Sequence, residues 1–160
     1  MGLRHLAHLA QSKLREHAKR GSAIARVLTG EPARSPHWRT IEKRWLHGFP
    51  GGPPAHDVCA CCGCRLHLQV HHIKPFHLWP SLELQDGTGV APATGGAGAT
   101  PNFITLCMGP FECHLEIGHA GSFRSEGNPR VVEDAALVRN NPALRADVVA
   151  KARLARLAAA

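Results

Sequence analysis

The sequence predicts a small α+β domain with helical extensions at its N- and C-terminal ends. Two short segments, residues 66–70 and 102–106, have the composition of β-strands, and the first alternates apolar with polar residues. Segments with apolar residues three and four positions apart lie before and after these strands, as in amphipathic helices. Cysteine pairs flank the strands, and a metal ion bound by them would stabilise a core with few aromatic side chains.

The length and the charge distribution indicate one domain that acts on a polyanion. A chain of 160 residues is long enough for one modest core with extensions. Residues 1–50 contain ten Lys or Arg and three acidic residues, residues 51–130 contain four and six, and residues 131–160 contain five and three. The basic surplus is therefore N-terminal, which suits contacts with the phosphates of DNA or RNA. The alternative is a basic helix that only solvates the surface.

The six cysteines all lie in the middle of the chain, at positions 59, 61, 62, 64, 107 and 113. Pairs separated by two residues are typical of metal-binding knuckles, whereas disulfide frameworks connect distant loops. We therefore expect a reducing compartment, the cytoplasm. No apolar run approaches the roughly 18 residues that cross a bilayer, so no membrane partner is expected.

Helices are expected on both sides of the strands. Residues 1–34 read as a basic helical arm and linker. Ser35 as N-cap and Pro36 as first helical residue open a second helix that ends at Gly48. Its apolar stripe, which favours core packing over base stacking, consists of Trp38, Ile41 and Trp45. The basic residues that remain available for phosphate are Arg39, Lys43 and Arg44.

The segments after the first strand follow in a clear order. Residues 85–101 are rich in Gly, Ala and Thr without a hydrophobic period, and we expect a mobile loop there. A short helix is predicted over residues 111–117 and another near 133–138. Asn141-Pro142 opens a last amphipathic helix, whose predicted apolar face is formed by Leu144, Val148, Ala152 and Ala155. The domain is thus expected over residues 35–135, with a C-terminal helix in 136–160.

The adjacent histidines His71 and His72 at the end of the first strand are the strongest indication of chemistry. Hydrolysis of a phosphodiester needs a base that deprotonates water and a cation that neutralises developing charge. A histidine accepts a proton at neutral pH, so one of the pair can be the base while the other binds the ion. Neighbours on a regular strand point to opposite faces, so both serve one site only if the strand ends or twists there.

Two later histidines and one asparagine complete the predicted site. His114 would be a second metal ligand, and His119 is the third candidate. On an ideal α-helix His119 lies about 140° away from His114, but Gly118 could end the helix and redirect the chain. Asn102 would hold a strand or loop in register, orient His72 through its amide, or do both.

The cysteines allow two pairings for a zinc knuckle, Cys59 with Cys62 or Cys61 with Cys64. Cys107 and Cys113 supply the other half of a tetrahedral site in either case. Gly63 favours the first pair, because glycine after the second cysteine gives the backbone room to turn. A different interpretation is a binding-type zinc finger without catalysis, with the ligands Cys59, Cys62, His72 and His77.

From Ser35 to Ala135 the sequence resembles the HNH endonucleases, in particular the compact phage and bacterial type with a cysteine-rich zinc site. The segments that carry the resemblance are Cys59-Ala-Cys-Cys62-Gly63, Leu68-Gln-Val70-His71-His72-Ile73-Lys-Pro75, Asn102-Phe-Ile104-Thr-Leu106-Cys107 and Cys113-His114-Leu-Glu-Ile-Gly118-His119. They occur in the family's order. The segment between His72 and Asn102 is longer than usual, and residues 1–34 fall outside the likeness.

The resemblance implies a treble-clef-like ββα-metal fold. It also implies an enzyme that hydrolyses DNA, with RNA as another possible substrate, in the cytoplasm of a bacterium or of a phage-infected cell. His72 would be the general base, Asn102 a positioning residue, and His71 and His114 ligands of one divalent ion, to which the residue pattern adds His119 as the third candidate. That ion would be Mg²⁺ or Mn²⁺, with Ni²⁺ or Zn²⁺ also accepted by imidazole. A structural Zn²⁺ would be held by Cys59, Cys62, Cys107 and Cys113.

On this interpretation the nucleic-acid contacts come from Arg39, Lys43, Arg44 and Lys74. Their positive charges would meet the phosphates of the DNA. The alternative function is a zinc-dependent nucleic-acid-binding module without hydrolysis. The sequence does not indicate an oligomeric state.

Overall fold

A computed structural model describes residues 34–52, 54–109, 111–123 and 126–159. The expected basic arm over residues 1–34 lies outside this part of the chain except for Arg34. Residues Ser35–Ala160 form one unit. Its elements in chain order are α2 (Trp38–His47), β1 (Leu68–His72), η1 (Pro80–Leu82), β2 (Phe103–Cys107), η2 (His114–Gly118), α3 (Val131–Asn140), η3 (Pro142–Leu144) and α4 (Arg145–Ala158).

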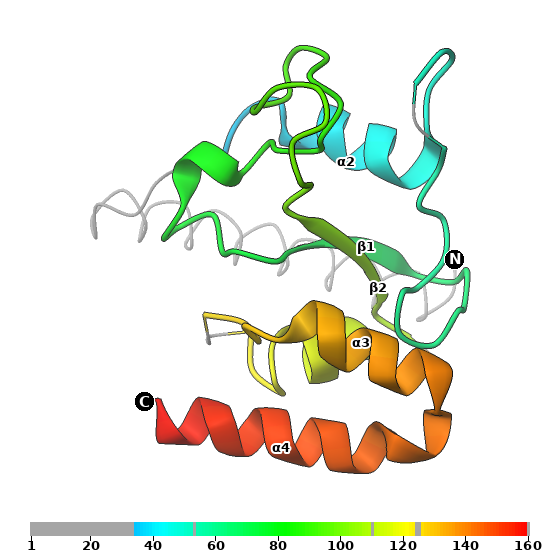
Figure 1. The fold of residues 1–160 in the computed structure, drawn as a ribbon, viewed down its shortest axis with the longest axis vertical. Helices are drawn as coiled ribbons and strands as arrows, with labels where there is room; N and C mark the ends of the chain where they lie inside the picture. The colour runs from blue at the N-terminus through cyan, green and yellow to red at the C-terminus, as the bar shows by residue number, and fades with distance from the viewer. Residues whose placement is uncertain (1–33, 53, 110, 124–125, 160) are drawn as a thin grey trace, which may run out of the picture. The chain divides into compact units, whose positions relative to one another are not determined.

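The centre of the unit is a two-stranded antiparallel sheet, in agreement with the predicted α+β class. The register pairs Leu68 with Cys107 at one end and His72 with Phe103 at the other. In Figure 1, α2 lies on one side of the sheet, and η2, α3 and α4 lie on the other. Each side has its own apolar cluster, one around Trp45 and Phe103 and the other around the cysteines. A sheet this small is stable only because both faces are covered.

Helix α2 confirms the predicted apolar stripe, since Trp38, Ile41 and Trp45 are all buried. Its C-terminal end at Gly48 is also confirmed, with a φ of +67° that favours glycine. The predicted N-cap was wrong, because the helix begins after His37 rather than after Ser35. The Trp38 N–H donates to the Ser35 carbonyl at 3.1 Å, so residues 35–38 form a turn that delays the first helical residue.

The Gly-rich insertion, residues 85–101, has no helix or strand, as predicted, but it is tied to the rest of the domain. Arg44 on α2 donates from Nη1 to the Val90 carbonyl at 2.8 Å and from Nη2 to the Ala91 carbonyl at 3.1 Å. Asp86 is buried within the insertion. Residues 85–101 therefore form a folded loop that contacts α2.

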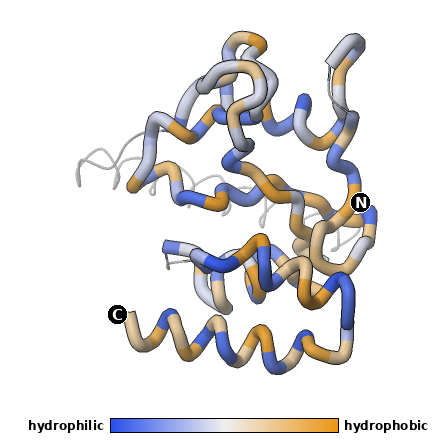
Figure 2. The backbone as a smooth tube through the Cα atoms, viewed as in Figure 1, coloured by the Kyte–Doolittle hydropathy of each residue, from blue (hydrophilic) through white to orange (hydrophobic). Residues whose placement is uncertain are grey.

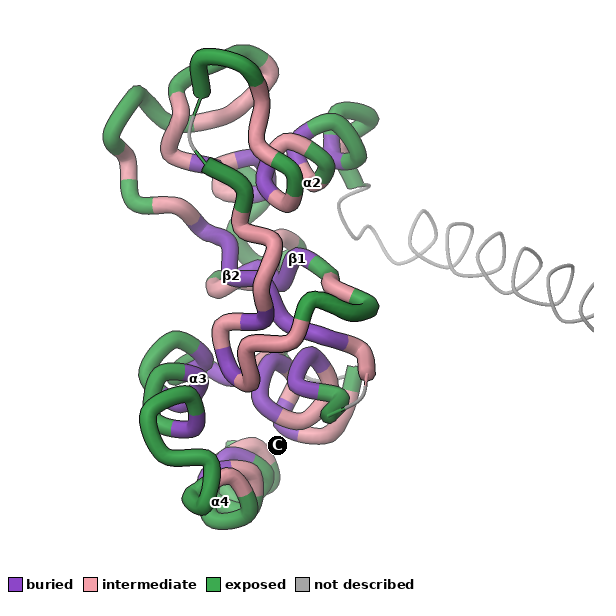
Figure 3. Tube along the Cα trace, turned by 90° about the vertical axis from the view of Figure 1, so that its right-hand side faces the viewer, coloured by how far each residue is buried: buried purple, intermediate pink, exposed green. Residues whose placement is uncertain are grey.

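The C-terminal helices α3 and α4 cover the cysteine side of the sheet (Figure 3). Asn141 and Pro142 separate them as predicted, and the Asn141 side chain accepts a hydrogen bond from Ala143 N at 3.2 Å. The buried face of α4 is narrower than predicted. Val148 and Ala152 are buried, whereas Leu144 and Ala155 are exposed.

Apolar residues concentrate along the sheet, while α4 alternates between polar and apolar positions (Figure 2). This alternation is what a helix with one buried face requires. Within the described ranges, no helix combines the length and the apolar character needed to traverse a bilayer.

Candidate functional site

Four cysteines form a group that could hold a zinc ion: Cys59, Cys62, Cys107 and Cys113. We refer to them as the cysteine quartet. Their Sγ atoms all lie within 4.8 Å of one another, and those of Cys62 and Cys107 are 3.6 Å apart. Four sulfurs bound to one tetrahedral zinc at about 2.3 Å are about 3.8 Å apart. The quartet therefore fits a structural zinc ion, as predicted.

The backbone turn over residues 59–64 brings the sulfurs of Cys59 and Cys62 to one side. Cys59 N donates to the Cys64 carbonyl at 2.8 Å, and Gly63 N donates to the Cys59 carbonyl at 2.9 Å. Gly63 has a φ of +76°, a conformation that other residues rarely adopt. A Cβ at this position would also lie 1.6 Å from Nη1 of Arg139. The predicted preference for Cys59 and Cys62 as the zinc-binding pair thus has a physical basis, because Gly63 allows the turn that follows Cys62.

Arg145, at the start of α4, supplies positive charge to the quartet. Its Nη1 donates to the sulfur of Cys113 at 3.2 Å and contacts the sulfur of Cys61 at 3.6 Å. Zinc binds the thiolate form, so a nearby guanidinium favours the charge state that the ion needs. Independently of Arg145, burial raises the pKa of Cys107, but hydrogen bonds from the Cys113 backbone and the neighbouring thiols outweigh burial and lower this pKa to about 7.

Cys61 and Cys64 lie outside the quartet. Cys61 is buried beside Arg145, and the Cys64 thiol faces the carbonyl oxygens of Leu66 and Gly109 at 3.7 Å. The single zinc finger with His72 and His77 is not formed, because Cys59 and Cys62 are grouped with the two later cysteines.

Three histidines form a second group that could hold a metal ion: His71, His114 and His119. We refer to them as the histidine cluster. Their ligand atoms lie within 4.8 Å of one another. Nε2 of His71 is buried and has no hydrogen-bond partner among the described residues. A buried nitrogen left unpaired is costly, and a cation shared with the other two imidazoles would satisfy it.

The spacing of His114 and His119 is explained by the type of helix that carries them. Element η2 is a π-helix, in which His119 N donates to the His114 carbonyl at 3.1 Å. A π-helical turn closes between residues i and i+5, so residues five apart lie on the same side. The helix does end at Gly118, as the sequence suggested, but this end is not what redirects the chain. The wider turn itself brings His119 back to His114.

Gly118 has a separate role in the cluster. A Cβ at this position would lie 3.0 Å from Nδ1 of His71 and 3.1 Å from Cδ1 of Leu106. The absence of a side chain therefore lets the π-helix approach the ring of His71 closely. Phe123 lies at the other side of the cluster, with its ring centroid 4.9 Å from that of His119.

Gln69 positions His114 and was not among the predicted residues. Its Oε1 accepts a hydrogen bond from Nδ1 of His114 at 2.8 Å, because an amide oxygen can only accept. This contact assigns the proton of a neutral His114 to Nδ1 and the lone pair that can bind a metal to Nε2. Gln69 precedes His71 by two residues on β1, so strand periodicity places both on one face and could have revealed it.

His72 lies on the opposite face of the sheet, because β1 continues through it instead of ending before it. Its ring stacks on Trp38 of α2 with a centroid distance of 4.5 Å. Its Nε2 lies 3.0 Å from the Glu83 carbonyl. A carbonyl only accepts, so Nε2 carries the proton of the neutral ring, and Nδ1 has the lone pair.

Asn102 holds the segments around His72 in place. Its side chain accepts from Lys74 N at 2.8 Å and donates to the carbonyl oxygens of Lys74 at 2.9 Å and Leu82 at 3.2 Å. These bonds connect the end of β1 with η1, next to the Glu83 carbonyl that His72 contacts. Asn102 thus has the predicted role of holding a loop in register.

The four predicted nucleic-acid contacts differ in their surroundings. Arg39, Lys43 and Lys74 are exposed. Arg44 instead uses its guanidinium to bind the carbonyl oxygens of the Gly-rich insertion. Contact with phosphate stays a prediction for all four.

No protein-family model, curated protein or solved structure matches the chain. The likeness to HNH endonucleases therefore stays a prediction from the motifs. The two ligand groups are the structural features from which a function can be proposed.

Burial lowers the pKa of His71 well below the ordinary value of 6.5, and the charges of His114, His119 and His72 lower it further. A depressed histidine pKa stabilises the folded state in full above pH 6.5, and this contribution is lost as the pH falls from 6.5 towards the folded pKa. We expect the free energy of unfolding in urea to fall more between pH 7.5 and 5.5 for the wild type than for His71→Gln. An equal loss of unfolding free energy in the wild type and in His71→Gln would show that the lowered pKa does not belong to His71.

The cysteine quartet predicts unequal effects of two serine substitutions. Cys107→Ser removes one zinc ligand and should reduce the zinc content measured by mass spectrometry, with a loss of several kcal/mol in stability. Cys64→Ser, outside the quartet, should retain one zinc ion and a Tm close to that of the wild type. Zinc loss in both variants, or in neither, would show that the ligands are different.

Proposed function

We propose that the chain is a metal-dependent endonuclease of the HNH type that hydrolyses DNA phosphodiester bonds. The observation that carries the proposal is the histidine cluster, whose member His71 lies near the end of β1, next to the buried imidazole of His72. The order of elements around it, β1, β2 and η2, supports the proposal, because a ββα-metal site would need two strands followed by a short helix. The basic surplus of the chain supports a polyanionic substrate.

The histidine cluster would hold one divalent ion, for which the unpaired Nε2 of His71 and the Gln69-oriented ring of His114 are suited. Such an ion supplies Lewis-acid stabilisation of the charge that develops on the phosphate. The low pKa of His71 keeps its imidazole in the neutral form that binds metal.

His72, the last residue of β1, would act as the general base, which requires the phosphate to lie at the end of the strand, where it can reach both faces of the sheet. With its proton on Nε2 towards the Glu83 carbonyl, Nδ1 accepts a proton from water. The water oxygen forms a bond to phosphorus, the bond from phosphorus to the 3′ oxygen breaks, and the departing oxygen takes up a proton from solvent. The stacking of His72 on Trp38 and the bonds of Asn102 keep the imidazole in one orientation.

The test of the base is cleavage of supercoiled plasmid by the zinc-loaded chain, with Mg²⁺, Mn²⁺ or Ni²⁺ added separately. We expect the wild type to nick or linearise the plasmid and His72→Ala to lose about 10²- to 10⁴-fold in rate while still binding DNA. His77→Ala, an exposed histidine five residues further on, is the matched control and should cut normally.

If no ion supports cleavage of DNA or of RNA while both proteins bind nucleic acid, the chain is a zinc-dependent binding module. That result would remove hydrolysis as the function. Equal cleavage by the wild type and His72→Ala would instead remove His72 as the base.

Gln69 provides a test of the second metal site. Gln69→Ala removes the hydrogen bond that orients His114, so the affinity for Ni²⁺ in calorimetric titration should fall by about 10- to 100-fold. Gln69→Glu retains an acceptor oxygen and should bind Ni²⁺ at least as well as the wild type. Unchanged binding by Gln69→Ala would show that the ion does not use His114.

A further inference from the structure

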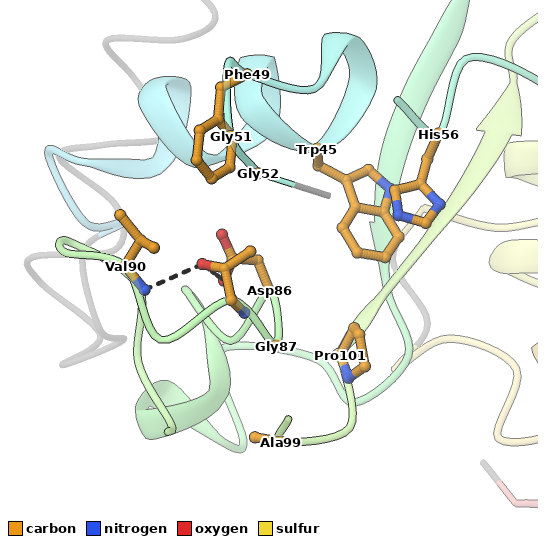
Figure 4. Close-up of a pocket in the computed structure, with 11 residues that line it drawn as sticks. Trp45, Phe49, Gly51, Gly52, His56, Asp86, Gly87, Val90, Ala99 and Pro101 are labelled. Atoms are coloured by element: carbon orange, nitrogen blue, oxygen red, sulfur yellow. Dashed lines mark hydrogen bonds between the residues drawn. The ribbon is translucent and has the colours of Figure 1, made fainter. Parts of the chain in front are cut away.

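A cavity of about 410 Å³ on the α2 side of the sheet is lined by residues of α2, the loop after it and the Gly-rich insertion (Figure 4). The carboxylate of Asp86 at this cavity is buried and lies against Arg44, so the cavity does not present this charge to a ligand. A stronger indication of further chemistry comes from the other side of the sheet. There, Cys61 and Cys64 lie beside the cysteine quartet without belonging to it.

Cys61 is already engaged by a positive charge. Its side chain is buried, and Nη1 of Arg145 lies 3.6 Å from its sulfur. Cys113 shares this contact, but its sulfur also lies within 4.8 Å of the three other sulfurs of the quartet. A guanidinium repels a metal cation and competes with it for the sulfur of Cys61. Arg145 therefore makes Cys61 a poor ligand for a zinc ion.

Cys64 is instead placed between the two halves of the quartet. Cys59 N donates to the Cys64 carbonyl at 2.8 Å, so Cys64 closes the turn that carries Cys59 and Cys62. The sulfur of Cys64 lies 3.7 Å from the carbonyl oxygen of Gly109, two residues beyond Cys107. Its thiol also interacts with the thiols of Cys62 and Cys107, whose sulfurs are 3.6 Å apart. Cys64 is thus a fifth thiol next to the zinc-binding group.

The contacts that hold Cys64 in place are weak. Its sulfur lies 3.7 Å from the carbonyl oxygens of Leu66 and Gly109, and a thiol is a poor hydrogen-bond donor. Cys62 and Cys64 are also the two cysteines with partly exposed side chains, whereas the other four are buried. A change of rotamer therefore costs less at these two cysteines than inside the core.

We propose that Cys64 is an alternative zinc ligand that takes the place of Cys62, so that four thiolates can hold the ion in two ways. The two ligand sets share Cys59, Cys107 and Cys113. In the exchange the bond from zinc to the sulfur of Cys62 breaks and the bond to the sulfur of Cys64 forms. The proton of the Cys64 thiol passes to the Cys62 thiolate, so the charge of the site is unchanged. The proposal rests on the quartet as a zinc site and does not require hydrolysis of DNA.

Alanine, which offers no ligand atom, should have unequal effects at Cys59 and Cys62. Cys62→Ala should retain one zinc ion in the full chain, because Cys64 supplies the fourth thiolate. Cys59→Ala should bind zinc at least about 100-fold more weakly than Cys62→Ala in competition with a chelator, since four ligands share the binding free energy of a structural zinc ion. Equal zinc affinities of the two variants would overturn the proposal.

A double variant tests the replacement itself. Cys62→Ala/Cys64→Ala should bind zinc as weakly as Cys59→Ala, because no fourth thiolate is left for the ion. Cys62→Ala/Cys61→Ala is the matched control and should bind zinc as tightly as Cys62→Ala. The proposal fails if removal of Cys64 from the Cys62→Ala variant leaves the zinc affinity unchanged.

Substitution of Co²⁺ for zinc counts the bound thiolates independently of affinity. Charge transfer from thiolate to cobalt absorbs in the near ultraviolet, and its intensity grows with the number of bound sulfurs. The wild type and Cys62→Ala should therefore have equal intensities per bound ion. Cys62→Ala/Cys64→Ala should have about three quarters of that intensity, because three thiolates remain of four. A loss of about a quarter already in Cys62→Ala would show that Cys64 does not bind the ion.

The outcomes for the alternative ligand and for the nuclease are distinguishable. Retention of zinc by Cys62→Ala, in a chain that cleaves no plasmid under any ion, would support the alternative ligand and remove hydrolysis. Cleavage that depends on His72, combined with equal loss of zinc in Cys62→Ala and Cys59→Ala, would retain the nuclease and remove the role of Cys64.

Discussion

The pairing of β1 with β2 in a single register is the constraint on which the rest of the domain depends. His71 faces Ile104 and His72 faces Phe103 across the ladder. Side chains alternate between the two faces of a strand, so a shift of one residue would exchange the surroundings of the two histidines. Neither the cluster with His114 nor the stack on Trp38 could then form. The apolar residues that cover both faces therefore also decide which imidazole meets which partners.

The cysteine quartet extends this constraint to the C-terminal helices. Cys107 ends β2, and Cys113 immediately precedes the π-helix, so an ion bound between them would fix the distance from the sheet to η2. Arg145 contacts the sulfur of Cys113 from the first residue of α4. A zinc ion would thus join the sheet, η2 and α4 at one point, which a domain with a small core needs.

The sequence predicted those features that follow from periodicity and from short-range spacing. The stripe of Trp38 and Trp45, the two strands and the zinc knuckle with Gly63 are of this kind. The features that the sequence did not predict depend on contacts between distant segments. The attachment of the Gly-rich insertion depends on Arg44, more than forty residues earlier, for which the sequence predicts only contact with phosphate. The role of Gln69 depends on which element packs against its face of the strand.

Because a π-helix connects His114 and His119, the number of residues between these two histidines affects the geometry of the site. A five-residue turn contains one residue more than an α-helical turn, so loss of one residue in this segment would restore the α-helix and still leave two histidines on one side. The same loss would displace Gly118 from its position against the His71 ring, where an added Cβ would lie only 3.0 Å from Nδ1. Insertions and deletions here are therefore constrained by clearance around His71 as well as by the angle between the two other histidines.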